Sequence, residues 1–138
     1  MIENKYKKII VSGKRKRAVA KATINEGNGK ITINNRDYKT LDFFDKLRIE
    51  EPLRIAHNIL GKINFNVEIK TQSGGARGQI EAARLALARA IVKFTKSQEL
   101  EDSYFDYDRT MLVADVRRKE SRKPGDSKAR AKRQKSYR

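Results

Sequence analysis

A glycine-rich stretch, SGGARGQ at residues 73–79, holds the residue types best suited to binding an anion. Glycines let backbone N–H groups approach an anion closely, and the amino end of a helix favours negative charge. Arg77 lies inside this stretch and Arg84 follows it. It is not a Walker A loop, because no Gly-Lys-Ser/Thr follows. The pattern favours contact with RNA phosphates over nucleotide hydrolysis, and a tight strand-to-helix turn is the plainer alternative.

A second cluster of cations, KRKR, stands at the start of an expected strand. Its members are Lys14, Arg15, Lys16 and Arg17. Such a cluster can bind the phosphate backbone of a nucleic acid, or it can be an ordinary solvated charged loop. The large positive charge elsewhere in the chain favours the first interpretation.

The chain ends in KARAKRQKSYR, in which six of eleven residues are Lys or Arg and none is acidic. Residues 117–138 hold 11 basic residues and only two acids, a net charge of +9, whereas the whole chain carries +16. This shift predicts two parts: a globular RNA-binding body at residues 1–116 and an extended basic tail at residues 117–138. Because the tail has so little apolar surface, we expect it to become ordered only on RNA.

The overall composition points to a polyanionic partner. A chain of 138 residues with a net charge of +16 repels itself unless a polyanion neutralises it. An anionic membrane is a weaker candidate, because no apolar run approaches the roughly 20 residues needed to span a bilayer. There is no cysteine, so disulfides and thiolate metal sites are excluded. We expect a cytoplasmic protein that binds nucleic acid and needs neither a metal nor a cofactor.

Two other groups could do chemistry. His57 is the single histidine, and we predict a partly buried structural role for it, since no second histidine or cysteine could complete a usual metal site. The segment ELEDSYFDYD clusters carboxylates that could serve acid–base or metal chemistry. We interpret it as a polar connector whose aromatic residues, Tyr104, Phe105 and Tyr107, anchor it to the core.

Strands are expected at residues 7–12, 17–24 and 31–34. The second alternates apolar and polar residues, and the glycine-rich EGNGK that follows predicts a hairpin with ITIN as the returning strand. INFNVEIK at residues 63–70 is the clearest strand, with Ile, Phe, Val and Ile facing one way. A last strand is expected around residues 111–114.

Two helices are expected, at residues 50–61 and residues 79–96. The first has Pro52 in its opening turn and Gly61 as a C-terminal cap. The second is amphipathic. Its apolar stripe consists of Ile80, Ala83, Leu87, Ile91 and Phe94, with Arg89, Lys93 and Lys96 nearly opposite. Strands and helices in this order predict an α+β fold with the helices packed on one face of the sheet.

The stretch SGGARGQIEAARLALARAI resembles the signature region of the small-subunit ribosomal protein nine family. That family shows a glycine-rich loop, then Gly-Gln, then an alanine-rich helix bearing an arginine. The matching positions here are Gly74, Gly75, Gly78, Gln79, Ala82, Ala86, Ala88, Arg89 and Ala90, and Ser73 departs from a usual glycine. GKRKRAVAKATI, GNGKITINNR, YDRTMLVADVRRKE and KRQKSYR are also similar to the family, the last two to its archaeal and eukaryotic branch.

The resemblance implies an α+β fold with a four-stranded sheet and an unusual left-handed βαβ crossover, like the second domain of ribosomal protein five. It implies a structural, non-enzymatic role in the head of the small ribosomal subunit, on the 3′ major domain of the ribosomal RNA and beside neighbouring head proteins. It also implies that the end of the tail approaches the anticodon stem-loop of the peptidyl-site tRNA. The residues concerned are Lys135, Ser136, Tyr137 and Arg138.

Residue types and resemblance together predict the ribosomal RNA contacts. They are Lys14, Arg15, Lys16, Arg17, Lys21, Gly74, Gly75, Arg77, Gly78, Gln79, Arg84, Arg89, Arg109, Arg117, Arg118, Lys119, Arg122, Lys123, Lys128, Arg130, Lys132 and Arg133. Two other classes stay open at this point: a free-standing nucleic-acid binder or RNA chaperone, and an RNA-processing enzyme using the acidic cluster.

Overall fold

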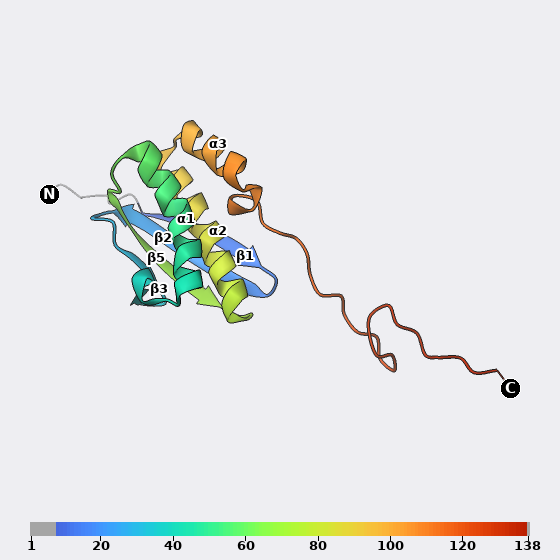
Figure 1. Ribbon diagram of the computed structural model, residues 1–138. Helices are drawn as coiled ribbons and strands as arrows, with labels where there is room; N and C mark the ends of the chain where they lie inside the picture. Colours follow the sequence, from blue (N-terminus) through green and yellow to red (C-terminus); the bar gives the residue numbers. More distant parts are fainter. Residues whose placement is uncertain (1–7, 138) are drawn as a thin grey trace.

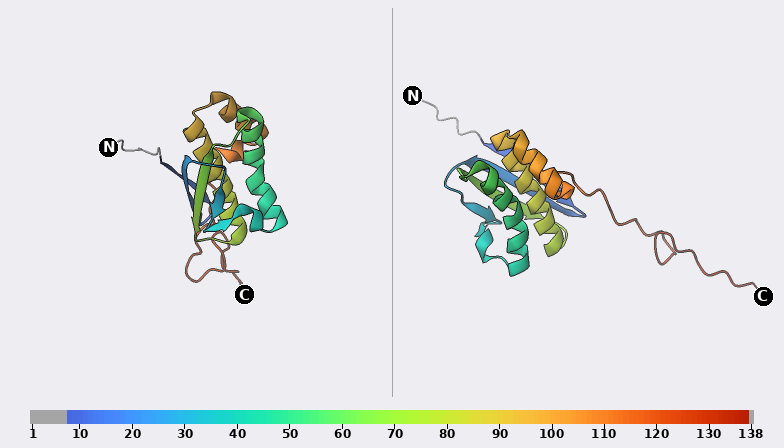
Figure 2. Two further views of the ribbon diagram at one scale, coloured as in Figure 1. Left: turned by 90° about the vertical axis from the view of Figure 1, so that its left-hand side faces the viewer. Right: turned by 45° about the horizontal axis from the view of Figure 1, so that its top comes forward.

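Strands and helices alternate along the chain in a computed structural model that describes residues 8–137. Five strands form one mixed sheet in the order β1-β2-β5-β3-β4, and the long helices cover one face of it (Figures 1 and 2). The predicted α+β class is therefore confirmed. The predicted number of four strands is wrong, because the described residues form five.

The first two strands, β1 (Ile9–Arg15) and β2 (Ala18–Glu26), form an antiparallel hairpin. Its register ends with Arg15 opposite Ala18, so only Lys16 and Arg17 make the turn. Lys16 has a φ of 54°, the left-handed conformation that tight hairpin turns require. The turn thus holds two cations at the tip of a rigid ribbon.

The glycine-rich turn after β2 does not lead into a hairpin, and that prediction is wrong. The next strand, β3 (Ile31–Ile33), pairs in parallel with β5 (Phe65–Gln72), and β5 pairs antiparallel with β2. The turn is built against the start of β5, since the Asn66 side chain accepts hydrogen bonds from the N–H groups of Asn28 and Lys30. Because β5 lies between β2 and β3, residues 27–30 pass over the place of β5, and the chain returns to that place only later, through a helix.

The fifth strand, β4 (Arg36–Asp37), has only two residues and both are exposed, so it leaves no apolar pattern in the sequence. Asn34 and Asn35, with φ values of 49° and 66°, make the tight turn from β3 into β4. This asparagine pair is the signal that could have predicted the strand. The parallel β3–β5 unit encloses helix α1, and the left-handed sense expected for this crossover stays a prediction.

The described residues form three α-helices. One lies between β4 and β5, and two follow β5. Helix α1 (Phe43–Leu60) begins well before the expected residue 50 and contains Pro52 in its interior, and a short 3₁₀ turn, η1 (Tyr38–Thr40), precedes it. Helix α2 (Ala76–Thr95) is the predicted amphipathic helix, and α3 (Gln98–Tyr107) lies beside α1 (Figure 1). None of the described helices is long and apolar enough to cross a membrane.

The last predicted strand is wrong, because the chain forms the 3₁₀ turn η2 (Arg109–Met111) there. The side chain of Asp108 starts this turn by accepting hydrogen bonds from the backbone N–H and hydroxyl of Thr110. Of the three residues of η2, only Met111 is buried. From residue 112 to residue 137 the chain has neither helix nor strand, and it leads away from the body (Figure 1). The boundary at residue 116 stays a prediction.

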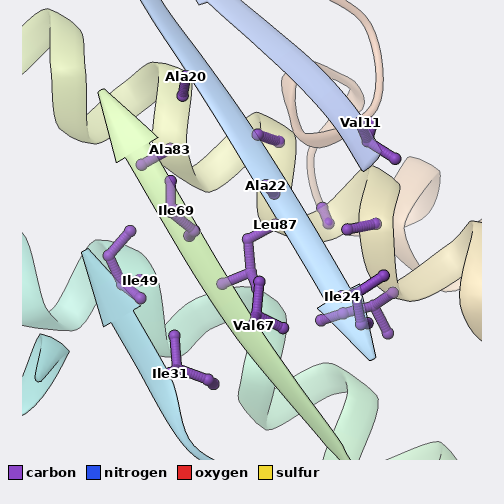
Figure 3. Close-up of a cluster of buried hydrophobic side chains, with 14 of the residues drawn as sticks. Val11, Ala20, Ala22, Ile24, Ile31, Ile49, Val67, Ile69, Ala83 and Leu87 are labelled. Carbon is purple, nitrogen blue, oxygen red and sulfur yellow. The ribbon is translucent and has the colours of Figure 1, made fainter. Parts of the chain in front are cut away.

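The core lies between the sheet and the helices (Figure 3). The predicted stripe of α2 is confirmed, with Ile80, Ala83, Leu87 and Ile91 buried and Phe94 packed half-exposed on the core. Small residues let α2 approach the sheet closely. A Cβ at Gly13 of β1 would lie 2.4 Å from the carbonyl oxygen of Ala82, so only glycine fits there.

Two predictions about single side chains need correction. His57 is exposed, because α1 buries the face of Ile49, Leu53 and Ala56 and His57 lies beside that face. Of the three aromatic residues of the acidic segment, only Tyr104 is buried, whereas Phe105 and Tyr107 are exposed. Tyr104 anchors α3 to the core together with Leu100.

Candidate nucleic-acid interface

Three segments that are far apart in the sequence line one open pocket. They are the β1–β2 turn, the loop that leads into α2, and the first residues after the body. The lining residues are Arg15, Lys16, Arg17, Gly74, Gly75, Ala76, Arg77, Gly78, Arg117, Arg118 and Lys119. All three segments were predicted from the sequence as phosphate contacts, and the structure brings them together. We call this surface the cationic pocket.

The loop before α2 has the geometry of an anion site. Ser73 and Gly74 have φ values of 60° and 70°, and α2 then begins with Gly75 as its N-cap, which has no side chain to satisfy the first N–H groups. Those N–H groups and the positive end of the helix favour a bound anion. The Gln79 side chain closes the loop by donating a hydrogen bond of 3.1 Å to the carbonyl oxygen of Ser73.

Glycine is required in this loop at Gly74. A Cβ there would lie 2.8 Å from the backbone nitrogen of Ala18, in addition to the strain of a positive φ. At Gly78 a Cβ would meet its nearest neighbour, the Cβ of Ala18, at an ordinary 3.5 Å. Gly75 has nothing within 4 Å of such an atom. The close backbone approach therefore occurs at Gly74, and it is an approach to β2.

Most of the cations predicted as RNA contacts are exposed to solvent. Lys14, Lys16, Arg17, Arg77 and Arg109 are exposed. Exposed too are the tail cations Arg117, Arg118, Lys119, Arg122, Lys123, Lys128, Arg130, Lys132, Arg133 and Lys135. The cationic surface therefore continues from the body into the segment beyond it.

Lys70 is a further exposed cation that the sequence prediction of RNA contacts did not include. It lies directly opposite Lys21 in the β2–β5 register, and both are exposed. Like charges directly opposite each other destabilise a sheet. The alternation of residues 63–70 already predicted that Lys70 lies on the polar side of its strand. The pairing of this strand with β2, which brings Lys70 opposite Lys21, could not be predicted from that pattern.

Three arginines predicted as RNA contacts lie in an internal network instead. Arg15 donates to Glu81 at 2.6 Å and also pairs with Asp115. Arg84 bridges Glu51 at 2.7 Å and Asp108 at 3.0 Å, with its side chain only 14% exposed.

Arg89 has no carboxylate partner in the described part of the chain. It donates to the carbonyl oxygens of Leu112 at 2.8 Å and Ser12 at 3.1 Å. The guanidinium groups of Arg15, Arg84 and Arg89 thus hold the body together, and a contact of theirs with RNA stays a prediction.

The carboxylates of this network stay ionised. Burial would raise the pKa of Glu81, but hydrogen bonds from Arg48 and Arg15 lower it below the ordinary value. Burial would likewise raise the pKa of Asp108, which hydrogen bonds from Thr110 and Arg84 lower. Hydrogen bonds from Arg117 hold the pKa of Asp115 far below its ordinary range. At neutral pH the network therefore consists of full charges.

The acidic segment does not form a metal site in residues 8–137, where no group of three His, Asp or Glu residues is suitably placed. Its acids are spread around α3, and Asp108 is occupied by Arg84 and Thr110. Of its acids, only Asp108 lines a second pocket, together with Glu51, Glu81 and Asp115 and with the arginines that pair with them.

The residues expected to reach a tRNA lie at the end of the tail. Lys135, Ser136 and Tyr137 are exposed, and Tyr137 retains 88% of its accessible surface. Arg138 lies outside the described residues. Closer to the body, Arg130 pairs with Glu120 at 2.6 Å, which folds the tail back on itself locally.

An α+β body with a cationic pocket and a strongly basic extension defines a class of small proteins built to face a polyanion. The model of the ribosomal protein S9/S16 family matches residues 13–138. Small ribosomal subunit protein uS9 of Methanococcus vannielii is 46% identical over 129 residues, which are 91% of this chain and 95% of that protein. The same protein of Methanococcus maripaludis strain C7 is 44% identical, with the same coverage. The chain belongs to the ribosomal protein S9/S16 family, and these two relatives are archaeal, in line with the branch that the sequence resemblance indicated.

Proposed function

We propose that this chain is a structural constituent of the small ribosomal subunit. The observation that supports this most is the match of one ribosomal family model to residues 13–138, almost the whole chain. Two relatives covered over 95% of their own length are both named small ribosomal subunit protein uS9. A role as a ribosomal component also accounts for a net charge of +16.

The partner of the body is ribosomal RNA, in the 3′ major domain that forms the head of the subunit. The cationic pocket supplies a helix amino end, backbone N–H groups and cations from three segments, which suits a phosphate backbone rather than a base sequence. Neighbouring head proteins complete the surroundings of the body.

The extension beyond the body threads through RNA. Its 22 residues can reach roughly 70 Å at about 3.3 Å each. Lys135, Ser136, Tyr137 and Arg138 contact the anticodon stem-loop of the peptidyl-site tRNA. The role is structural, and the carboxylates of Glu81 and Asp115 are paired with Arg15.

The test is assembly. The chain carrying an affinity tag is expressed in an archaeal host, and ribosomal subunits are separated by sedimentation in high salt. The chain should remain with the small subunit, and crosslinks should fall on the 3′ major domain of its RNA. A free-standing nucleic-acid binder or RNA chaperone would be washed off, because its binding depends on charge alone. Release by salt, with no crosslink to that domain, would reject the proposal.

A further inference from the structure

An acidic residue, Asp115, lies where the cationic pocket meets the extension. Its carboxylate accepts hydrogen bonds from the side chain of Arg117 at 2.7 to 3.1 Å and from the backbone N–H of Arg117 at 2.9 Å. It also pairs with Arg15 at the end of β1. One carboxylate thus joins an arginine of the sheet to an arginine of the extension, 102 positions apart in the chain numbering.

The segment that bears Asp115 has no helix or strand to hold it. Side chains fix it instead. Arg89 joins the carbonyl oxygen of Leu112 to that of Ser12 in β1. Arg15, itself held by Glu81 of α2, fixes Asp115. The side chains of Arg15 and Asp115 are only 18% and 21% exposed, so this connection is partly shielded from solvent.

The residues that follow are part of the cationic pocket. Arg117, Arg118 and Lys119 line it together with Gly74 and Arg77. The carbonyl oxygen of Asp115 accepts a hydrogen bond from Arg118 at 3.3 Å, so Asp115 contacts two of these three cations. Apart from the bonds to Asp115, no described hydrogen bond of the backbone of residues 117–119 directs these three cations toward the loop before α2.

We infer that Asp115 is a positioning residue for RNA binding, which holds Arg117, Arg118 and Lys119 over the amino end of α2. The inference rests on the proposed function and goes one step further. An acid at the edge of a phosphate site repels RNA by itself. Its benefit is that three cations are ordered before RNA arrives, so less conformational entropy is lost on binding.

The two effects of Asp115 have opposite signs, which makes the inference testable. If charge alone mattered, Asp115→Asn would remove a repulsion and RNA would bind more tightly. If positioning matters, the same change weakens binding, because an amide has one acceptor oxygen and no charge and so cannot hold both Arg15 and Arg117 as the carboxylate does. Asp126→Asn is the matched control, since Asp126 is the other aspartate of this region and its carboxylate has no hydrogen bond or ion pair in the described chain.

The experiment measures the affinity of the full chain for a transcript of the 3′ major domain over a series of salt concentrations. Asp115→Asn should bind about 3- to 10-fold more weakly, and its plot of log affinity against log salt should be flatter by about one to two units, as phosphate contacts are lost. Asp126→Asn should bind as well as the unaltered chain or slightly better, with the same slope. Asp115→Glu keeps the carboxylate and should recover most of the affinity.

The outcomes separate the inference from the proposed function. If the unaltered chain shows no salt-dependent affinity for this RNA, the proposed function fails. If it binds and Asp115→Asn binds at least as tightly as Asp126→Asn, the positioning role is overturned. Should Asp115→Asn unfold, two glycines inserted between Val116 and Arg117 serve instead. They retain every charge and the pair with Arg15, yet should produce the same loss, and unchanged binding would equally reject the inference.

Discussion

The hydroxyl of Tyr104 donates a hydrogen bond of 2.8 Å to the carbonyl oxygen of Pro52, and Tyr104 is completely buried. This contact joins α3 to the middle of α1. Pro52 lies inside that helix and has no N–H, so it cannot donate the backbone hydrogen bond of an ordinary helical residue. The tyrosine therefore contacts α1 at the residue where the helix lacks one backbone hydrogen bond.

Removing this hydroxyl should destabilise the body without affecting RNA binding. We expect Tyr104→Phe to lower the free energy of unfolding by about 0.5–1.5 kcal/mol, and Tyr104→Ala by about 3–5 kcal/mol, because the second also leaves a cavity. Chemical denaturation measures both. Phe105→Leu, at an exposed neighbour, is the control. Equal stability of Tyr104→Phe and the unaltered chain would mean that the hydrogen bond contributes nothing.

The body should lose stability in acid. Glu81, Asp108 and Asp115 have pKa values lowered by their arginine and backbone partners. The unfolded chain therefore binds more protons in acid. The stability from these pairs is complete above the ordinary carboxyl pKa of about 4 and is lost as the pH falls through the lower folded values. Thermal melts between about pH 6 and 2 test this. At neutral pH, Glu81→Gln should melt at a lower temperature than the unaltered chain. In acid, the two melting temperatures should lie closer together. Asp106→Asn should melt like the unaltered chain at both pH values.

The loop before α2 should tolerate a side chain at one glycine and reject it at its neighbour. Gly74→Ala forces a Cβ against β2 at a positive φ, and we expect a loss of at least about 1–2 kcal/mol of stability together with weaker RNA binding. Gly75→Ala meets open space at a φ of −100° and should remain within about 0.5 kcal/mol. Denaturation of both variants decides, and similar stabilities would contradict the close approach seen at Gly74.

The extension should be accessible to protease in the free protein. Residues 117–138 have little apolar surface to offset the entropy of ordering, so limited trypsin treatment should remove them and leave the body folded. The truncated body should bind RNA with a much flatter salt dependence. Each single Lys or Arg to Ala change in the extension should flatten it by about one unit or less. Equal protease resistance of body and extension would contradict the two-part organisation.

The end of the chain should affect tRNA more than assembly. Deleting residues 136–138 removes one cation out of 33, so small subunits should still assemble, while their affinity for peptidyl-site tRNA should fall. Arg138→Lys should lose less affinity than Arg138→Ala, because lysine retains the charge and loses only the two parallel hydrogen bonds of a guanidinium. If truncated subunits hold tRNA as well as complete ones, the tip has no tRNA role.

Local patterns in the sequence were enough to predict the parts of the fold whose partners are close at hand. The alternation that buries Ala18, Ala20, Ala22 and Ile24 predicted β2, and the 3.6-residue stripe from Ile80 to Ile91 predicted α2. The pairing of β3 could not be predicted in this way. The glycine-rich turn looks like a hairpin locally, and the preference of β3 for β5 depends on a strand more than thirty positions further along.

The sequence was enough to predict which types of residue line the candidate site. It was not enough to predict which of its arginines pair with carboxylates. Lys16, Arg17 and Arg77 are exposed around the pocket, as cations in loops usually are. Arg15 and Arg84 have the same side chain, yet their partners are carboxylates brought close only by folding. Nothing near Asp115 in the sequence distinguishes it from an ordinary surface acid, because its partner Arg15 is 100 positions away.

The central place of β5 in the sheet has a consequence for the order of folding during synthesis. The pairing of β1 with β2 is local in the sequence, so this hairpin can form as soon as Glu26 is available. The remaining edge of β2, and β3 with it, must wait for residues 65–72, since β5 is the partner of both. Until then a strand edge rich in small apolar residues stays open, which is a site where nascent chains aggregate. Lys16 and Arg17 in the β1–β2 turn are synthesised before β5. We expect their positive charge to make incompletely folded nascent chains repel one another.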